Sequence, residues 1–247
     1  MILRFSLFLF FTLSWVSLSS CGSSEKEAEL ILTGDYQSQS FAQLEDLQLY
    51  SSAGQITDPA VITNFLNHDI GINIRQKYGD GFVQGKNTEE LKGLFSISFR
   101  EEKKATVTLP FQSSSSNPIE TQITEKNNKL IILTGLDSIT RITSVESSDS
   151  YGSNINLYNS QGKCRPISTS GGYSIICKAP PVFPIHHNSG ELSLPLFSYF
   201  LRNSRNGTTS FSWGSNIFGV FNRSILSKML LGDTLVIQSK KVALDKR

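Results

Sequence analysis

The sequence has few charged residues and few of the side chains that usually carry chemistry. Charged residues make up 18% of the 247 residues, below the quarter that is usual in globular proteins, and the formal net charge is +2. This small charge argues against a basic surface that binds nucleic acid or an anionic membrane. There are only three cysteines and no Cys-x-x-Cys motif, so a thiol redox enzyme is not expected.

The chain also lacks the short motifs of common enzyme classes. There is no His-Glu-x-x-His, which removes the usual zinc-peptidase helix, and no Gly-x-Ser-x-Gly, which disfavours an α/β-hydrolase. The stretch Gly79–Asn87 is interpreted as a loop and not as a phosphate-binding loop, because Asp80 stands where the first glycine is needed. The paired Glu89 and Glu90 lie in a polar segment and are interpreted as solvated. We expect no cofactor, and an enzyme only if its site cannot be recognised from one sequence.

The three histidines do not predict a metal site. His68 lies near the end of a predicted helix, where a cation complements the helix dipole. His186 and His187 lie among Pro, Asn and Gly residues, which predicts a solvated loop. Adjacent histidines in an extended chain point to opposite faces, so they rarely bind one metal together. A site in which Glu191 closes back on His187 is the less favoured alternative.

The beginning of the chain carries the strongest functional signal. Arg4 is followed by Phe5–Leu18, which is apolar apart from Ser and Thr. The run is shorter than the roughly 20 residues of a membrane-spanning helix, but it fits the apolar core of a secretory signal peptide. The small residues before Cys21 resemble the lipobox of bacterial lipoproteins, in which the cysteine is acylated and becomes the mature N-terminus.

This resemblance implies a cellular location for the protein. Residues 1–20 would be a lipoprotein signal peptide, and residues 21–29 a lipidated Cys21 with a flexible tether. Gly22 follows the cysteine in place of the Asp that, in well-studied Gram-negative lipoproteins, signals retention in the inner membrane. The expected location is the cell envelope, in the outer membrane, on a face that the sequence does not decide.

The two remaining cysteines lie on either side of a turn signal. Cys164 and Cys177 flank Ser170-Gly171, so a hairpin folded there would bring the two cysteines roughly opposite each other. In an oxidising compartment they would form a disulfide, which the chain-entropy model values at roughly 3 kcal/mol for a loop of this size. The alternative is two buried free thiols that pack as small apolar side chains.

Residues 30–247 are expected to form a single antiparallel β-domain with two short helices packed on it. One helix begins after Asp58 and ends before Gly71, and the other begins after Asn222 and ends before Gly232. Short alternating segments separated by polar turns predict a meander that closes as a barrel or folds as a sandwich. The candidate strands are Glu29–Leu32, Gly34–Phe41, Leu44–Tyr50, Leu94–Phe99, Ala105–Leu109, Thr121–Thr124, Lys129–Leu133, Ile139–Val145, Asn154–Tyr158, Tyr173–Cys177, Leu192–Leu201, Thr208–Trp213 and Asp233–Leu244.

This organisation is similar to the lipocalin-like lipoproteins of the Bacteroidota envelope. Gly34-Asp35-Tyr36 lies where lipocalins place Gly-x-Trp at their first strand, with Tyr in place of Trp. The closing segment Gly232–Ile237 resembles the terminal strand of such barrels. The resemblance implies a barrel whose interior can hold a small apolar ligand, and it brings no catalytic residues.

Aromatic residues crowd the last quarter of the chain. In Leu196–Leu201 both faces are apolar, which indicates a strand buried on each side or one that faces an apolar cavity. Core packing is the simpler interpretation. A ligand cavity lined by Tyr36, Phe197, Phe200 and Trp213 is the functional one. The expected function is an anchored, non-enzymatic lipoprotein that binds a small apolar ligand or a partner protein, with a structural or assembly subunit of an envelope complex as the alternative.

Overall fold

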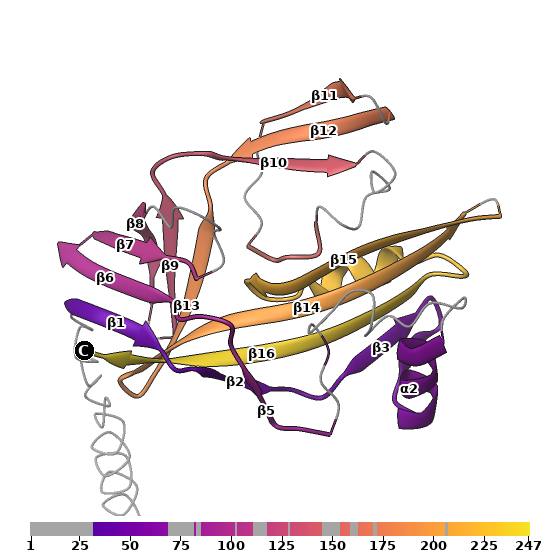
Figure 1. Ribbon diagram of the computed structural model, residues 1–247, viewed down its shortest axis with the longest axis horizontal. Helices are drawn as coiled ribbons and strands as arrows, with labels where there is room; N and C mark the ends of the chain where they lie inside the picture. Colours follow the sequence, from indigo (N-terminus) through magenta and orange to yellow (C-terminus); the bar gives the residue numbers. More distant parts are fainter. Residues whose placement is uncertain are drawn as a thin grey trace, which may run out of the picture. The chain divides into compact units, whose positions relative to one another are not determined.

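The described part of the chain is mainly β-structure (Figure 1). The computed structural model describes residues 32–68, 82, 85–101, 103–110, 118–127, 129–144, 154–158, 163–169, 172–205 and 207–247. The predicted signal peptide, Cys21, the tether and most of the predicted loop at residues 79–87 lie outside these ranges. None of the helices in the described ranges is both long enough and apolar enough to cross a bilayer.

Eight antiparallel strands close into a barrel, so the barrel alternative is confirmed over the sandwich. Around the barrel wall each strand pairs with the next, and the last strand pairs again with the first. The strands follow one another as β14 (Glu191–Arg205), β13 (Val182–Asn188), β9 (Leu130–Gly135), β8 (Ile119–Lys126), β7 (Lys104–Thr108), β6 (Ser96–Glu101), β1 (Gly34–Ser38) and β16 (Thr234–Lys246).

Large apolar side chains fill the barrel. Along β6, β7 and β9 alternate residues are buried, as expected when one face of a closed sheet points inward. Phe95, with none of its surface exposed, contacts the ring of Phe218 edge-on at 4.8 Å between ring centroids, and Phe183 contacts the same ring at 5.5 Å. The buried set includes Ile97, Phe99, Ala105, Val107, Ile131, Leu133, Ile185, Leu194, Leu196 and Val242. This interior is a packed core.

The strands β14 and β16 are much longer than the barrel wall requires, and they continue beyond it side by side (Figure 1). The strand β15 (Thr208–Phe218) pairs with β14 along this extension. On the β16 side the extension carries β2 (Phe41–Leu44), β3 (Gln48–Ser51), β4 (Gly54–Ile56) and β5 (Thr88–Glu90).

The extension is apolar on both faces. On one face, Phe197, Tyr199 and Leu201 pack with residues around the 3₁₀ helix η3 (Arg223–Lys228). On the other face, Phe200 packs against the helix α2 (Pro59–His68). The prediction that Leu196–Leu201 is a strand buried on each side is therefore confirmed.

Hairpin positions predicted from turn residues agree well with the structure. The strands β11 (Lys163–Thr169) and β12 (Gly172–Ala179) pair so that Cys164 lies directly opposite Cys177. The strand β10 (Ile139–Ser144) adds to β12 and completes a separate three-stranded sheet.

The predicted second short helix is confirmed as the 3₁₀ helix η3, which Asn222 caps by accepting a hydrogen bond from the Ser224 N–H. Two other local predictions are corrected. Asn154–Tyr158 contributes only an isolated bridge, between Asn156 and Phe221, and no strand. His186 and His187 lie on β13, a barrel strand, where a loop was predicted.

Candidate functional site

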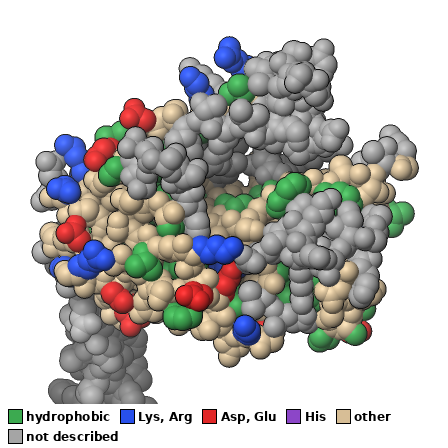
Figure 2. Space-filling model, in the orientation of Figure 1, with side chains coloured by type: hydrophobic (Ala, Val, Ile, Leu, Met, Phe, Trp, Pro, Cys, Tyr) green, Lys and Arg blue, Asp and Glu red, His purple; other side chains and the backbone are tan. Residues whose placement is uncertain are grey.

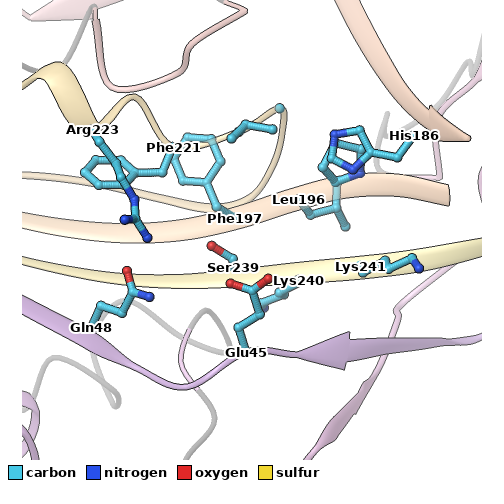
Figure 3. A pocket seen from close by; sticks show the side chains of 13 residues that line it. Glu45, Gln48, His186, Leu196, Phe197, Phe221, Arg223, Ser239, Lys240 and Lys241 are labelled. Carbon is cyan, nitrogen blue, oxygen red and sulfur yellow. The ribbon is translucent and has the colours of Figure 1, made fainter. Parts of the chain in front are cut away.

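An open pocket of about 240 Å³ lies beside β14 and β16, close to where they leave the barrel (Figure 3). Its floor comes from β14 and β16, one wall from the turn between β2 and β3 and the start of β3, and the other from the segment that joins β15 to η3. The lining residues are Glu45, Gln48, His186, Pro195, Leu196, Phe197, Gly219, Val220, Phe221, Arg223, Ser239, Lys240 and Lys241.

Two opposite charges point into this pocket from facing walls. Figure 3 shows the Arg223 guanidinium directed inward from η3, and the Glu45 carboxylate directed inward from the turn between β2 and β3. Figure 3 shows the Ser239 hydroxyl between them and the Gln48 amide beside them, on the same wall as Glu45. Within the described ranges, neither Arg223 nor Glu45 has an ion-pair partner. Lys241, which also lines the pocket near His186, adds a second cation. The pocket thus offers two cations and one anion to a ligand.

The floor of the pocket is apolar. Phe197 is fully buried and Phe221 nearly so, and both belong to the core cluster on this face of the extension. The Phe221 ring packs against Tyr50, at 6.2 Å between ring centroids. Because both rings are already covered, they support the pocket from beneath and offer no stacking surface, and the half-buried Val220 is an apolar side chain that a ligand can contact.

Gly219 allows the segment between β15 and η3 to pass close to the Asn156 side chain. Its φ of +131° lies outside the range that L-residues readily adopt. A Cβ atom built at Gly219 would lie 2.1 Å from the Asn156 side-chain oxygen. Asn156 in turn donates a hydrogen bond to the Phe218 carbonyl at 2.6 Å, which fixes the chain just before the wall.

His186 lies at one end of the pocket and is half-buried. Burial lowers the pKa of His186 from its ordinary value, and the nearby Lys241 ammonium lowers it further. At neutral pH the imidazole is therefore neutral and can donate or accept a hydrogen bond. His187 accepts a hydrogen bond from the Gly190 N–H at 3.2 Å, and the described residues include no group of metal ligands.

Lys240, a buried lysine on β16, links the two strands that lead into the walls of the pocket. Lys240 forms an ion pair with Glu89 and donates a hydrogen bond to Asn216 Oδ1 at 2.7 Å. Glu89 lies on β5, which pairs with β2 at Ala42 and so braces the wall that carries Glu45. Asn216 lies on β15 just before the other wall. The interpretation of Glu89 as a solvated carboxylate is wrong, since only 9% of its side chain is exposed.

A second hollow, of about 270 Å³, lies between α2 and the extension, but Arg202, the charged residue in its lining, already has contacts. Arg202 donates a hydrogen bond to Thr234 Oγ1 at 2.8 Å, and its guanidinium lies 5.4 Å from the centroid of the Phe65 ring. The pocket beside η3 is the better candidate because its charges have no such partners among the described residues.

The four predicted ligand residues do not gather around one cavity. Tyr36 packs edge-on against Phe99, and Phe200 packs against Phe65 under α2. Trp213 is 51% exposed on β15, and only Phe197 lines the pocket.

Sequence reasoning missed the polar lining of this pocket. Glu45, Gln48, Arg223 and Ser239 are ordinary surface residue types in three separate segments. No spacing rule connects them. They come together only through strand pairing.

Comparisons of this chain with protein-family models, with curated proteins and with solved structures found no match.

Proposed function

We propose that this chain is a lipid-anchored envelope lipoprotein that binds a small molecule in the pocket beside η3 and catalyses no reaction. The facing charges of Arg223 and Glu45 over an apolar floor carry this proposal. The packed barrel interior favours a ligand held outside the barrel. The charged walls favour a ligand with polar groups over the purely apolar one that the sequence predicts.

The anchor supports a function at the membrane surface. The signal peptide over residues 1–20 and the lipid on Cys21 place the β-domain outside the cytoplasm, and Gly22 favours the outer membrane. Figure 2 shows basic and acidic side chains mixed over the described part of one face, which does not favour nucleic acid as a partner.

Pocket occupancy can be tested without knowing the ligand. The full chain, extracted in detergent from the envelope in which it is made, should carry a small-molecule adduct in native mass spectrometry. Replacing the half-buried Ser239 with Trp should fill the pocket and remove the adduct.

A matched variant controls for the added bulk. Ser96 is also half-buried, on the barrel strand β6, and it does not line the pocket. Ser96→Trp should therefore keep the adduct. If the wild-type chain carries no adduct, or if Ser239→Trp keeps it, the pocket is not the binding site.

The Cys164–Cys177 disulfide belongs to the same extracytoplasmic setting, and the β-hairpin register supports it. We expect neither cysteine to react with an alkylating agent in the denatured chain until a reductant is added. Cys177→Ser should make Cys164 reactive without reductant. Alkylation of both cysteines in the unreduced wild-type chain would show that they are free thiols.

An assembly role is the second candidate, and one exposed turn favours it. Leu230 and Leu231, between η3 and β16, are 54% and 89% exposed. Large apolar side chains grouped on a surface often mark a contact with another protein. Leu231→Ser should leave the free energy of unfolding within about 0.5 kcal/mol and abolish photo-cross-links made from Lys228 in intact cells.

The control for this turn is Leu136→Ser, since Leu136 is also 54% exposed but lies elsewhere, after β9. Cross-links that persist in Leu231→Ser, or that disappear equally in Leu136→Ser, would count against a partner at this turn.

A further inference from the structure

The chemistry of the pocket beside η3 assigns it a ligand class, provided that the pocket binds a small molecule as proposed. The geometry points to a free α-amino acid with an apolar side chain. Its carboxylate would pair with Arg223, its ammonium group with Glu45, and its side chain would rest on the half-buried Val220 beside Phe221.

The first argument is charge. Arg223 and Glu45 lie on facing walls, both directed inward, and neither is paired within the described ranges. A guanidinium binds a carboxylate through two parallel hydrogen bonds, and a carboxylate accepts hydrogen bonds from an ammonium group. A ligand that carries both charges can pair with both walls at once. A simple anion would also face the Glu45 carboxylate, and a simple cation would also face the Arg223 guanidinium.

The second argument is the set of neutral groups between the charges. The Ser239 hydroxyl can donate or accept, and the amide of Gln48 can do both. The Gln48 side-chain oxygen already accepts a hydrogen bond from the Tyr50 hydroxyl at 2.7 Å, which orients the amide so that its NH₂ group remains available as a donor. Figure 3 shows the amide oxygen on the Arg223 side and the NH₂ group turned toward the middle of the pocket, where it can donate to a ligand.

The third argument is size. A volume of about 240 Å³ corresponds to about eight water molecules at their liquid volume, so the pocket encloses a group of on the order of ten non-hydrogen atoms. A free amino acid of this size would be held whole, whereas only part of a nucleotide would enter. The aromatic residues of the floor are buried in the core cluster, so the stacking surface that a sugar would use is not offered.

The test is isothermal titration of the full chain in detergent with leucine and two derivatives that each lack one charge. Leucine should bind. N-acetyl-leucine lacks the ammonium group and leucinamide lacks the carboxylate, and each should bind at least about tenfold more weakly, the loss of one charged hydrogen bond. The dipeptide leucyl-glycine separates the two charges by a peptide unit and should bind more weakly than leucine.

Variants assign each charge of the ligand to a wall. Arg223→Ala should weaken leucine by about tenfold and leave leucinamide unchanged, while Glu45→Gln should weaken leucine and leave N-acetyl-leucine unchanged. Lys228→Ala and Asp46→Asn remove exposed charges close by that do not line the pocket, and they should bind leucine as the wild type does.

The outcomes separate this inference from the proposed function. If the derivatives or the dipeptide bind as well as leucine, the amino-acid assignment is overturned. If leucine does not bind while the extracted chain carries an adduct that Ser239→Trp removes, the assignment fails and the pocket remains a binding site. If leucine does not bind and the extracted chain carries no adduct, both the amino-acid assignment and the proposed function fail.

Discussion

Lys240→Ala is expected to lower the free energy of unfolding by about 3–5 kcal/mol, measured by urea denaturation. The Lys240 side chain is completely buried, and it pairs with Glu89, whose side chain is 9% exposed. Removing the ammonium group would leave the Glu89 carboxylate without its charge partner in a region that excludes water. An unpaired buried charge is among the most destabilising features of a folded protein.

Two further variants show whether the unpaired charge is the cause. Lys240→Met combined with Glu89→Leu removes both charges and should restore most of the lost stability, because apolar residues of similar volume often replace a buried ion pair at little cost. Lys241→Ala removes the next residue, an exposed cation, and should change stability by no more than about 0.5 kcal/mol. The explanation is contradicted if Lys240→Ala is as mild as Lys241→Ala, or if the double variant is less stable than Lys240→Ala.

Cys21→Ser is expected to abolish labelling of the protein with radioactive palmitate and to release it from the membrane fraction. A single acyl chain gives only marginal membrane binding, whereas the two or three chains of a mature lipoprotein hold it stably. The described residues contain no helix that would replace this anchor. The loss should therefore be nearly complete.

Cys164→Ser provides the matched control for the anchor. It also removes one thiol, but from β11, and it should keep both the label and the membrane association. Unchanged labelling of Cys21→Ser would contradict the lipoprotein assignment.

Much of the barrel could be predicted from local signals. Alternation of apolar and polar residues predicted the positions of β6, β7 and β9, and turn residues predicted the register of β11 and β12. The apolar residues on both faces of Leu196–Leu201 predicted burial of β14 on each side, because a strand between two packed layers needs no polar face.

Other features depend on contacts that no local pattern reveals. Pro184 and the Asn and Gly residues after His187 predicted a loop, yet β13 pairs with β9 at Pro184, because tertiary pairing outweighs local propensity. The ion pair between Glu89 and Lys240 joins positions 151 residues apart. Glu89 looked solvated because its burial depends on β5 reaching β16 through β2.

The pocket was beyond prediction for the same reason. Glu45, which is followed by Asp46, and Arg223 are charges in polar segments, and both are exposed residues in the fold as they would be in an extended chain. They face each other only because β2, β3 and η3 assemble around the same length of β14 and β16. The aromatic residues in the last quarter of the chain include Phe197 and Phe221, which lie next to the pocket, but their rings form the core beneath it.

Hydrogen exchange of the full chain with and without saturating leucine tests most directly whether ligand is held beside η3 and not inside the barrel. Bound ligand slows exchange where it contacts and orders the backbone. Protection should be confined to residues 45–48, 195–197, 219–223 and 239–241, which form the walls and floor. No protection in these segments, or protection of the barrel strands β6, β7 and β9 in their place, would contradict the account.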